Sequence, residues 1–528
     1  MPVGDEIKKS LWKSSEKLRG QVESSEYKHI VLGLLFLRDA SIRFDKYQST
    51  IEEKYEPKNE EEKEKLLKKQ LTSESAFYIP KEARWENIGQ SDKNMNQTLD
   101  DAMQEIMDEN PRLDGRLPKR YQQANVKPDS LRHIYDEFSK IDVSSDENTD
   151  DDFVGRIYEY FIRQFAIETA QGSGEFYTPQ DVVELLIESL QPLEGRIFDP
   201  CAGTGGMFVQ TYEHANKTDG YRGKDMDFYG QEINNASISL AEMNMFLRNM
   251  SDAVTLKEGD SLLNDRITED LDENSLGANK VISNPPFNYT YNKKDIDDDD
   301  PRFPYGLPNK QNANYAFVQH MLYHTKDGGT VGTVMANGAL SNNSDRDIRK
   351  GLVEDDLVDV IITLPSKLFY TVSIPVSIFI FSKGKGKNNP NHRNRSGETL
   401  FIDASDMYEK KSRSEHRLKN EYINKISNTI QKYRGELDTN INAEDYNIDN
   451  FCSVAKIKEI KNKEYNFNPG RYIYYDTNTE YTPLKVRLPE LQGQLESKFK
   501  QNKELESEIM TQLDNLTQDN KKGDLKNE

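Results

Sequence analysis

The first part of the chain carries its apolar residues at helical spacing. The stretch YKHIVLGLLFLRDASIRFDKY (27–47) places them three and four positions apart, and a highly charged stretch follows at 51–71. Residues 131–142 (LRHIYDEFSKID) repeat an amphipathic pattern. Because this spacing gathers apolar side chains on one face of an α-helix, we expect a helical N-terminal domain over residues 1–148.

The spacing changes after about residue 153. Short runs rich in β-branched and aromatic residues now alternate with stretches of helical periodicity. Strands that alternate with helices are typical of parallel sheets covered on both faces. We therefore expect an α/β domain over residues 149–475 with a doubly wound, mostly parallel, seven-stranded sheet. The predicted strands lie within residues 195–200, 227–233, 253–260, 279–287, 328–340, 357–366 and 375–383.

The last part of the chain shows a third pattern, a narrow apolar stripe in a charged background. Its apolar residues fall close to heptad spacing over residues 484–528. We expect a C-terminal helical tail over residues 476–528 whose stripe is covered either by the chain's own N-terminal helices or by another subunit. The stripe consists of Leu488, Leu491, Leu495, Phe499, Leu505, Ile509, Leu513 and Leu516.

Composition narrows the class of protein. Charged residues make up 30% of the chain, and no stretch approaches the roughly eighteen uncharged apolar residues of a membrane span. The start of the chain lacks the apolar core of a signal peptide. The two cysteines, Cys201 and Cys452, have no histidine partners at metal-ligand spacing. We expect a cytoplasmic protein without membrane spans, disulfide bonds or a metal site.

The net charge of −21 is unlike that of a typical nucleic-acid-binding protein. Residues 383–395 (KGKGKNNPNHRNR) form a local basic stretch, which is either a solvated connector or a phosphate-binding patch. If the chain contacts DNA, most of the attraction to phosphates must come from such local patches or from a partner.

A glycine-rich turn separates a predicted strand from a predicted helix in residues 197–215 (IFDPCAGTGGMFVQTYEHA). Glycines permit a tight turn and let a ligand approach the backbone at the helix N-terminus. The third glycine of the dinucleotide pattern G-x-G-x-x-G is missing, and Asp199 offers a carboxylate to a cation. These features favour a positively charged nucleoside, S-adenosylmethionine, over a dinucleotide. The expected cofactor-binding residues here are Asp199, Ala202, Gly203, Thr204, Gly205 and Gly206.

Acidic residues end the next two predicted strands. Glu232 is placed to accept hydrogen bonds from both ribose hydroxyls of a nucleoside. The alternative for Glu232 is a helix N-terminal acid favoured by the helix dipole. Asp260 is placed to accept from the adenine amino group, or it is simply a turn residue.

The segment GSGEFYTPQDVVELL (172–186) precedes the first predicted strand. Thr178 is a natural N-cap and Pro179 a natural first helical residue. Capping does not explain the two aromatic residues just before the cap, which are suited to close over a flat ligand. We expect this segment to contact the cofactor through Glu175, Phe176, Tyr177, Thr178, Pro179 and Gln180.

The stretch ISNPPFNYT (282–290) is the most specific feature of the chain. The prolines stop the strand ladder and stiffen the backbone. The Asn284 side-chain oxygen and the Pro285 carbonyl are then placed to accept from an aromatic amine, which is a poor nucleophile while its lone pair is delocalised. Phe287 offers a stacking face. The predicted catalytic residues are Asn284, Pro285, Pro286 and Phe287; Tyr289 and Tyr291 are possible further stacking faces, although we expect both at the surface.

The order FYTP, DPCAGTGG, an acidic strand end, GD and NPPF resembles the amino-methyltransferases of DNA. Further stretches narrow the resemblance to the modification (methyltransferase) subunit of type I restriction–modification systems, over roughly residues 150 to 475. They include ANYAFVQHML, DGGTVGTVMANGALS, IRKGLVEDDLVDVIITLPSKLFY, IPVSIFIFSK, LFIDAS and FNPGRYI. Cys201 departs from the alanine common in that family, with no expected catalytic meaning.

This resemblance implies an adenine-N6 DNA methyltransferase subunit that uses S-adenosylmethionine on an adenine rotated out of the duplex and protects host DNA. It also implies a separate specificity subunit, a second copy of the modification subunit, a restriction motor subunit and double-stranded DNA as partners. The acidic run 295–300 is then expected to become ordered only with DNA and a partner.

Three other functions remain open from the sequence. A protein glutamine-N5 methyltransferase uses the same amide-orienting corner, but the long N-terminal region and Phe287, where tyrosine is typical, disfavour it. A non-catalytic scaffold would bind the methyl donor without transferring the methyl group. A dehydrogenase is disfavoured by the missing glycine.

Overall fold

In the computed structural model the chain forms two units, residues 1–473 and 474–528. The described residues are 3–19, 21–22, 24–73, 77–91, 94–124, 126–140, 153–169, 178–271, 273–369, 374–386, 392–412, 415–436 and 446–475, with parts of 488–510.

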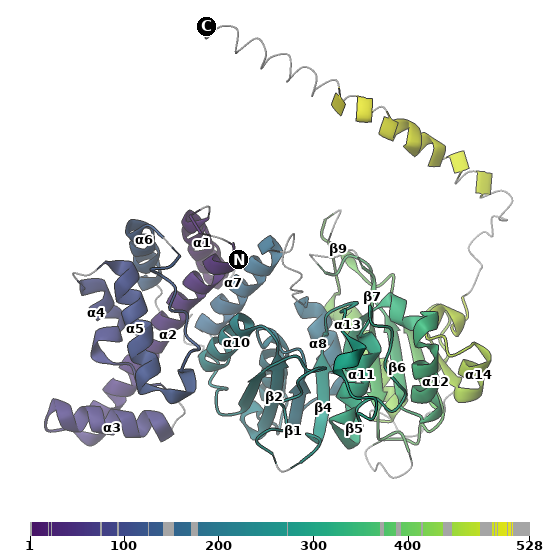
Figure 1. Ribbon diagram of the computed structural model, residues 1–528, viewed down its shortest axis with the longest axis horizontal. Helices are drawn as coiled ribbons and strands as arrows, with labels where there is room; N and C mark the ends of the chain where they lie inside the picture. The colour runs from purple at the N-terminus through teal and green to yellow at the C-terminus, as the bar shows by residue number, and fades with distance from the viewer. Residues whose placement is uncertain are drawn as a thin grey trace, which may run out of the picture. The chain divides into compact units, whose positions relative to one another are not determined.

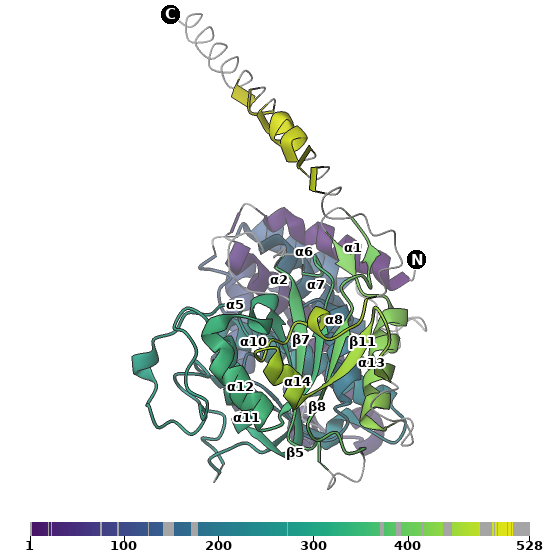
Figure 2. The ribbon, with the colours of Figure 1, turned by 90° about the vertical axis from the view of Figure 1, so that its right-hand side faces the viewer.

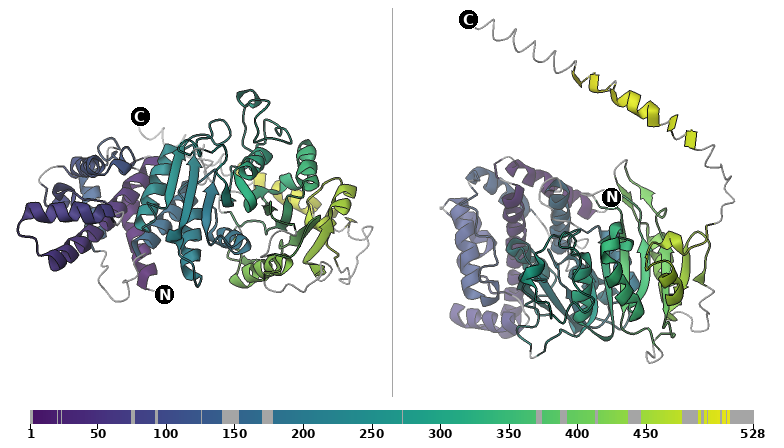
Figure 3. Two further views of the ribbon diagram at one scale, coloured as in Figure 1. Left: turned by 90° about the horizontal axis from the view of Figure 1, so that it is seen from below. Right: turned by 45° about the vertical axis from the view of Figure 1, so that its right-hand side comes forward.

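Amphipathic helices form the N-terminal region, as the apolar spacing predicts. Their apolar faces share one core, to which α10 (Asn235–Leu247) contributes the side chains of Phe246 and three neighbours. Figure 3 shows these helices, in purple and blue, gathered at one end of the larger unit. They are α1 (Val3–Ser15), α2 (Ser24–Tyr55), α3 (Glu60–Ser73), α4 (Trp85–Gln90), α5 (Met95–Glu109), α6 (Pro128–Ser139) and α7 (Phe153–Thr169).

The described part of the following region contains a sheet of nine strands in the order β11-β8-β6-β7-β5-β4-β1-β2-β3 (Figure 1). β7 runs antiparallel to β5 and β6, and β11 runs antiparallel to β8, while all other pairs are parallel. The strands are β1 (Gly195–Asp199), β2 (Met226–Glu232), β3 (Val254–Glu258), β4 (Ala278–Ser283), β5 (Thr325–Ala336), β6 (Val358–Thr363), β7 (Val376–Ser382), β8 (Glu398–Asp403) and β11 (Cys452–Lys456).

The mixed α/β fold with a mostly parallel sheet is as predicted, but the expected number of seven strands is wrong. The two additional strands, β8 and β11, extend the sheet beyond β6. β8 follows the basic stretch, and β11 is a sheet-edge strand whose burial alternates only weakly. Neither strand is a long apolar run in the sequence, so the pattern of apolar residues did not predict them as strands.

Helices cover both faces of the sheet, and each face has its own core. Figure 2 shows α11 and α12 on one side of the sheet and α13 on the other. One layer contains α8 (Gln180–Leu190), α9 (Gly206–Lys217) and α13 (Asn420–Arg434); the other contains α11 (Asn314–Tyr323), α12 (Arg346–Glu354) and α14 (Ile457–Asn462). A small hairpin of β9 (Glu409–Lys410) and β10 (His416–Arg417) lies outside the sheet. β6 and β7 are buried along their whole length, as expected for strands covered on both faces.

The unit 474–528 is described only in part, and those pieces between 488 and 510 are helical. Their apolar side chains are more than half exposed at Leu488, Leu495, Phe499, Leu505 and Ile509. Leu491, Leu513 and Leu516 of the predicted stripe lie outside the described residues. Within the part of the chain that is described, no helix has the length and apolar character needed to cross a membrane.

Candidate active site

The order of strands in the sheet reverses at β1, which lies between β2 and β4. The carboxyl ends of β1 to β4 lie at the same edge of the sheet, since these strands are parallel. Ligands of open α/β sheets bind at such a switch point. Asp199 ends β1, Glu232 ends β2, Asp260 follows β3 and Asn284 follows β4. All four line one cavity of about 450 Å³.

The other predicted site residues fall into three groups, according to whether they line this cavity and whether the structure describes them. Those that line it are Thr178, Ala202, Gly203, Thr204, Gly206 and Pro286. Those that are described but do not line it are Pro179, Gln180, Gly205, Pro285 and Phe287. Glu175, Phe176 and Tyr177 lie outside the described residues.

The glycine turn is fixed by its own backbone and by Glu232. Gly203 and Gly205 adopt φ of +54° and +76°, a left-handed conformation that side chains disfavour. A Cβ atom at Gly205 would also lie 2.6 Å from the Met245 side chain. The Gly203 N–H donates to Glu232 Oε2 at 2.9 Å, and the Asn234 N–H donates to Oε1 at 2.9 Å. Glu232 therefore joins the turn to the start of α10.

Asp199 is buried at the centre of this edge of the sheet. Its Oδ1 accepts from Ser283 Oγ at 2.6 Å and from the Cys201 N–H at 2.9 Å. Burial raises the pKa of Asp199 to about 7, with Glu232 adding to the rise and the two hydrogen bonds opposing it. A cationic ligand in the cavity would favour the ionised form of this carboxylate.

Asn284 presents a buried amide oxygen that has no partner. Its Nδ2 donates to Thr178 Oγ1 at 2.8 Å, which orients the amide. Its Oδ1 is buried and accepts no hydrogen bond from any described residue. A buried polar atom left unpaired costs about 1–3 kcal/mol, and this oxygen is free of described donors to accept a hydrogen bond from a ligand.

The contact with Asn284 corrects the prediction for Thr178. Pro179 is the N-cap of α8, which begins at Gln180, and no side chain caps this helix. The Thr178 hydroxyl instead pairs with Asn284, 106 residues along the chain. Capping preferences describe local sequence only, so they could not anticipate this long-range partner.

The aromatic residues of the corner differ from expectation. Phe287 is half-buried, with its ring edge-on to Phe369 at a centroid distance of 5.8 Å. Tyr289, expected at the surface, lines the cavity and donates to Asp260 Oδ2 at 2.9 Å. Burial and this hydrogen bond raise the pKa of Tyr289 to about 12. Tyr291 is buried, and its hydroxyl donates to the Pro308 carbonyl at 2.8 Å.

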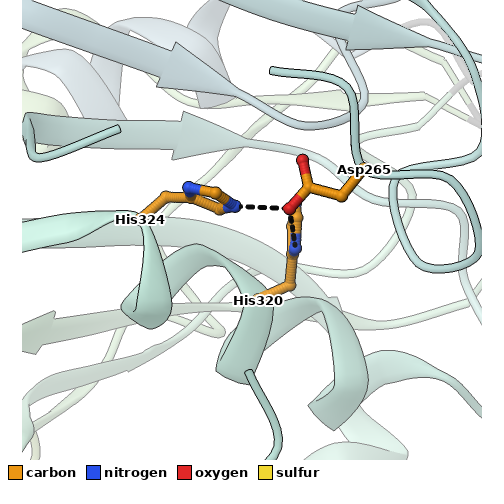
Figure 4. A group of neighbouring side chains, drawn as sticks. All are labelled: Asp265, His320 and His324. Carbon is orange, nitrogen blue, oxygen red and sulfur yellow. Dashed lines mark hydrogen bonds and ion pairs between the residues drawn. The ribbon is translucent and has the colours of Figure 1, made fainter. Parts of the chain in front are cut away.

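A buried cluster beside the cavity brings together Asp265, His320 and His324 (Figure 4). Such a trio has the donor atoms to hold a metal ion, but its contacts point to another role. His324 accepts from the Leu276 N–H through Nδ1, so its Nε2 carries the proton and donates to Asp265 Oδ2 at 2.8 Å. The Arg302 guanidinium supplies the cation, 3.7 Å from the same oxygen.

Arg302 connects this cluster to the cavity wall. It donates to the carbonyls of Ser261 and Leu262 at 2.9 and 2.8 Å and pairs with Asp300 at 2.7 Å. Asp300 belongs to the acidic run that we expected to become ordered only with DNA and a partner. The structure pairs Asp300 with Arg302, and the same guanidinium holds the loop that carries Asp260; the expected dependence of the run on DNA stays a prediction.

Comparison with known proteins identifies the family. Residues 149–481 match the N-6 DNA methylase family, and residues 7–138 match the HsdM N-terminal domain. The chain belongs to the N-6 DNA methylase family. Most residues that line the cavity at the carboxyl ends of β1 to β4 lie within the part that matches the N-6 DNA methylases.

Full-length relatives are similar over most of the chain. It is 34% identical to the type I restriction enzyme MjaIX methylase subunit of Methanocaldococcus jannaschii, over 97% of this chain and 91% of that protein. It is 32% identical to the HindI methylase subunit of Haemophilus influenzae, over 79% of this chain and 92% of that protein. The crystal structure of a type I methyltransferase subunit from Streptococcus thermophilus superposes with a TM-score of 0.74 at 25% identity, covering 90% of this chain and 100% of that chain.

These similarities confirm the predicted family, the modification subunit of type I restriction–modification systems, and its activity class, adenine-N6 DNA methylation. The rival prediction, a glutamine-N5 methyltransferase acting on protein, finds no support in these relatives.

Proposed function

We propose that the cavity binds S-adenosylmethionine together with an extruded adenine, and that Asn284 orients the adenine amine for methyl transfer. The observation that carries this proposal is the buried, unpartnered Asn284 Oδ1 on the cavity wall. This oxygen can accept a hydrogen bond from an N–H group, and the N6 amine of adenine carries such a group.

The residues of the cavity suit the cofactor. A volume of about 450 Å³ falls in the range of small-molecule sites. Asp199, Glu232 and Asp260 supply acceptors for a sulfonium nucleoside that carries ribose hydroxyls and an adenine amine. When bound, this cofactor supplies an electrophilic methyl group. The cofactor-binding roles of the glycine turn and of residues 175–180 remain part of the proposal.

The chemical contribution of the corner is orientation and electrostatics. Asn284 Oδ1 accepts from the adenine amine, and the Pro285 carbonyl, although Pro285 does not line the cavity, is proposed as the second acceptor. Two acceptors favour a tetrahedral nitrogen and direct its lone pair into the cavity. The consecutive prolines hold both acceptors in place. Thr178 keeps the amide from rotating, since it occupies the Asn284 Nδ2 donor. Phe287 is proposed as a stacking face for the base.

Extrusion of the adenine from the duplex costs a few kcal/mol. We propose that this chain also depends on partner subunits to bind its target sequence on DNA. With a net charge of −21, it is poorly suited to hold DNA alone. We propose that a specificity subunit reads the DNA sequence and joins two copies of this chain, with a restriction motor subunit in the complete nuclease. The exposed apolar side chains between Leu488 and Met510 suit helical docking on the specificity subunit.

The boundaries 1–148, 149–475 and 476–528 are proposed as the helical domain, the methyltransferase domain and the docking tail. A cytoplasmic location is proposed for the assembled complex.

The decisive experiment uses the chain reconstituted with its specificity subunit, DNA and a methyl-labelled donor. We expect label on DNA in the wild type and a loss of at least about 100-fold in Asn284→Ala, with cofactor affinity within about twofold. The control Asn428→Ala, an exposed asparagine of α13, should methylate normally. Label on protein, or normal methylation by Asn284→Ala, would reject the proposed function.

A further inference from the structure

The cavity wall is not built by the methyltransferase domain alone. α2, in the helical N-terminal domain, contributes Lys28 and Leu32, and α7, which packs on these helices from the start of the methyltransferase domain, contributes Ile162, Phe165 and Ala166. Lys28 and Leu32 are four positions apart, so they share one face of their helix. The helical region therefore forms part of the site that the sequence assigned wholly to residues 175–287.

Packing fixes the position of this added wall. The Phe165 ring meets Tyr27 and Trp12 edge-on, each at a centroid distance of 4.9 Å. From the same helix as Phe165, the Tyr158 hydroxyl donates to the Leu240 carbonyl of α10 at 3.1 Å. Arg248 ties α10 to the start of α7 through the Gly155 carbonyl at 3.1 Å. Lys28 follows Tyr27 directly, so its backbone is held by this aromatic cluster.

The charges on the wall are unequal. Three carboxylates line the cavity: Asp199, Glu232 and Asp260. Among the described lining residues, Lys28 is the one lysine or arginine. S-adenosylmethionine carries two cationic groups, the sulfonium and the amine, which the carboxylates suit. It also carries one carboxylate, which those side chains would repel.

We propose that Lys28 binds the carboxylate of the cofactor's amino-acid end. This inference rests on the proposed cofactor, and it gives the helical N-terminal region a direct role in cofactor binding. A lysine is suited to this task because its ammonium offers three donors on a flexible stem. Lys28 is half-buried beside apolar neighbours, where an ion pair is screened less than one at the surface.

Two ligands that differ in the amino-acid end test the proposal. S-adenosylhomocysteine carries the carboxylate, whereas 5′-methylthioadenosine keeps the adenosine and sulfur but lacks it. Their binding to the full chain is measured by calorimetry for the wild type, Lys28→Met, Lys28→Arg and the control Lys46→Met, an exposed lysine of the same helix. Thermal unfolding checks that each variant is folded.

We expect Lys28→Met to weaken S-adenosylhomocysteine by about tenfold or more and methylthioadenosine by less than about twofold. Lys28→Arg should retain most of the affinity, and Lys46→Met all of it. Equal losses for both ligands, or none for S-adenosylhomocysteine, would overturn the proposal. Unchanged S-adenosylhomocysteine binding with a raised KM for DNA would assign Lys28 to a DNA phosphate instead. If the wild type bound neither ligand, the proposed cofactor itself would fail.

Discussion

Two groups of buried polar side chains differ in how their charges and hydrogen-bonding atoms are paired: the cluster of Asp265, His320, His324 and Arg302, and the corner at Asn284. Around Arg302, the charged groups are paired with other groups of the same chain. Asp265 pairs with His324 and Arg302, and both ring nitrogens of His324 take part in hydrogen bonds. In the corner at Asn284, one amide oxygen has no partner among the described residues. A cluster whose charges are paired within the chain stabilises the fold, whereas an acceptor with no described partner at a cavity can accept from a ligand.

The contrast is not complete, because His320 Nε2 in the cluster is also buried without a described partner. His320, however, is fully buried and does not line the cavity. Burial lowers the pKa of His320 well below its usual range, so the imidazole stays neutral. Burying the Nε2 atom of a neutral ring without a partner costs less free energy than burying an unpaired charge. Among the residues that the structure describes, only Asn284 combines a buried atom without a partner with a place on the cavity wall.

Removal of Arg302 should produce the largest change in stability. Arg302→Gln leaves Asp265 and Asp300 without their cation and should lower the free energy of unfolding by about 2–4 kcal/mol, measured by urea denaturation. Loosening of the Asp260 loop should also weaken cofactor binding. The control Arg222→Gln, an exposed arginine paired with Asp225, should change stability by less than about 0.5 kcal/mol. If Arg302→Gln abolished methylation without affecting stability or cofactor affinity, the cluster would be catalytic and the comparison wrong.

Asp199 should make stability depend on pH. Its folded pKa is raised to about 7, so between pH 4 and 7 the folded state binds more protons than the unfolded state. Stability is therefore lost as pH rises through this window. Asp199→Asn cannot ionise, and its oxygen can still accept from Ser283. At pH 8 the variant without ligand should be more stable by roughly 1–3 kcal/mol.

The difference between the wild-type and Asp199→Asn unfolding curves isolates this one group. Parallel curves from pH 4 to 8 would show that Asp199 is ionised throughout. A variant that is less stable at every pH would show that the carboxylate is needed for folding.

The smallest effect is expected at Thr178. Thr178→Val keeps the shape but removes the acceptor for Asn284 Nδ2, so the amide is less well oriented. We expect a loss of about 1 kcal/mol of transition-state stabilisation, or about fivefold in kcat, with unchanged cofactor affinity. Thr218→Val, at the end of α9, is the matched control. A loss as large as that of Asn284→Ala would mean that Thr178 itself contacts the substrate.

The parts of the fold that repeat a local pattern could be predicted from the sequence. Asp199 and Glu232 end their strands as expected, because apolar runs interrupted by polar residues mark strand ends. The strands β8 and β11 were not predicted, because their runs of apolar residues are short or interrupted by polar residues. The helical N-terminal region followed from its 3.6-residue spacing.

Contacts between distant residues could not be predicted. Thr178 has an optimal capping sequence, yet a partner 106 residues away uses its hydroxyl. Nothing in the sequence around Lys28 or Phe165 indicates that they reach the cavity, since the packing of α2 and α7 on α10 decides this. Tyr289 was expected at the surface, but its hydroxyl donates to Asp260, 29 residues away in the sequence, and it lines the cavity.

The most direct test compares two DNA duplexes in the reconstituted complex with S-adenosylhomocysteine. One carries adenine at the target position, and the other carries purine, which has hydrogen in place of the N6 amine. The wild type should bind the adenine duplex about tenfold more tightly, and Asn284→Ala should bind both equally. If Asn284→Ala still preferred adenine as strongly as the wild type does, the amine would bind elsewhere and the account of this corner would be wrong.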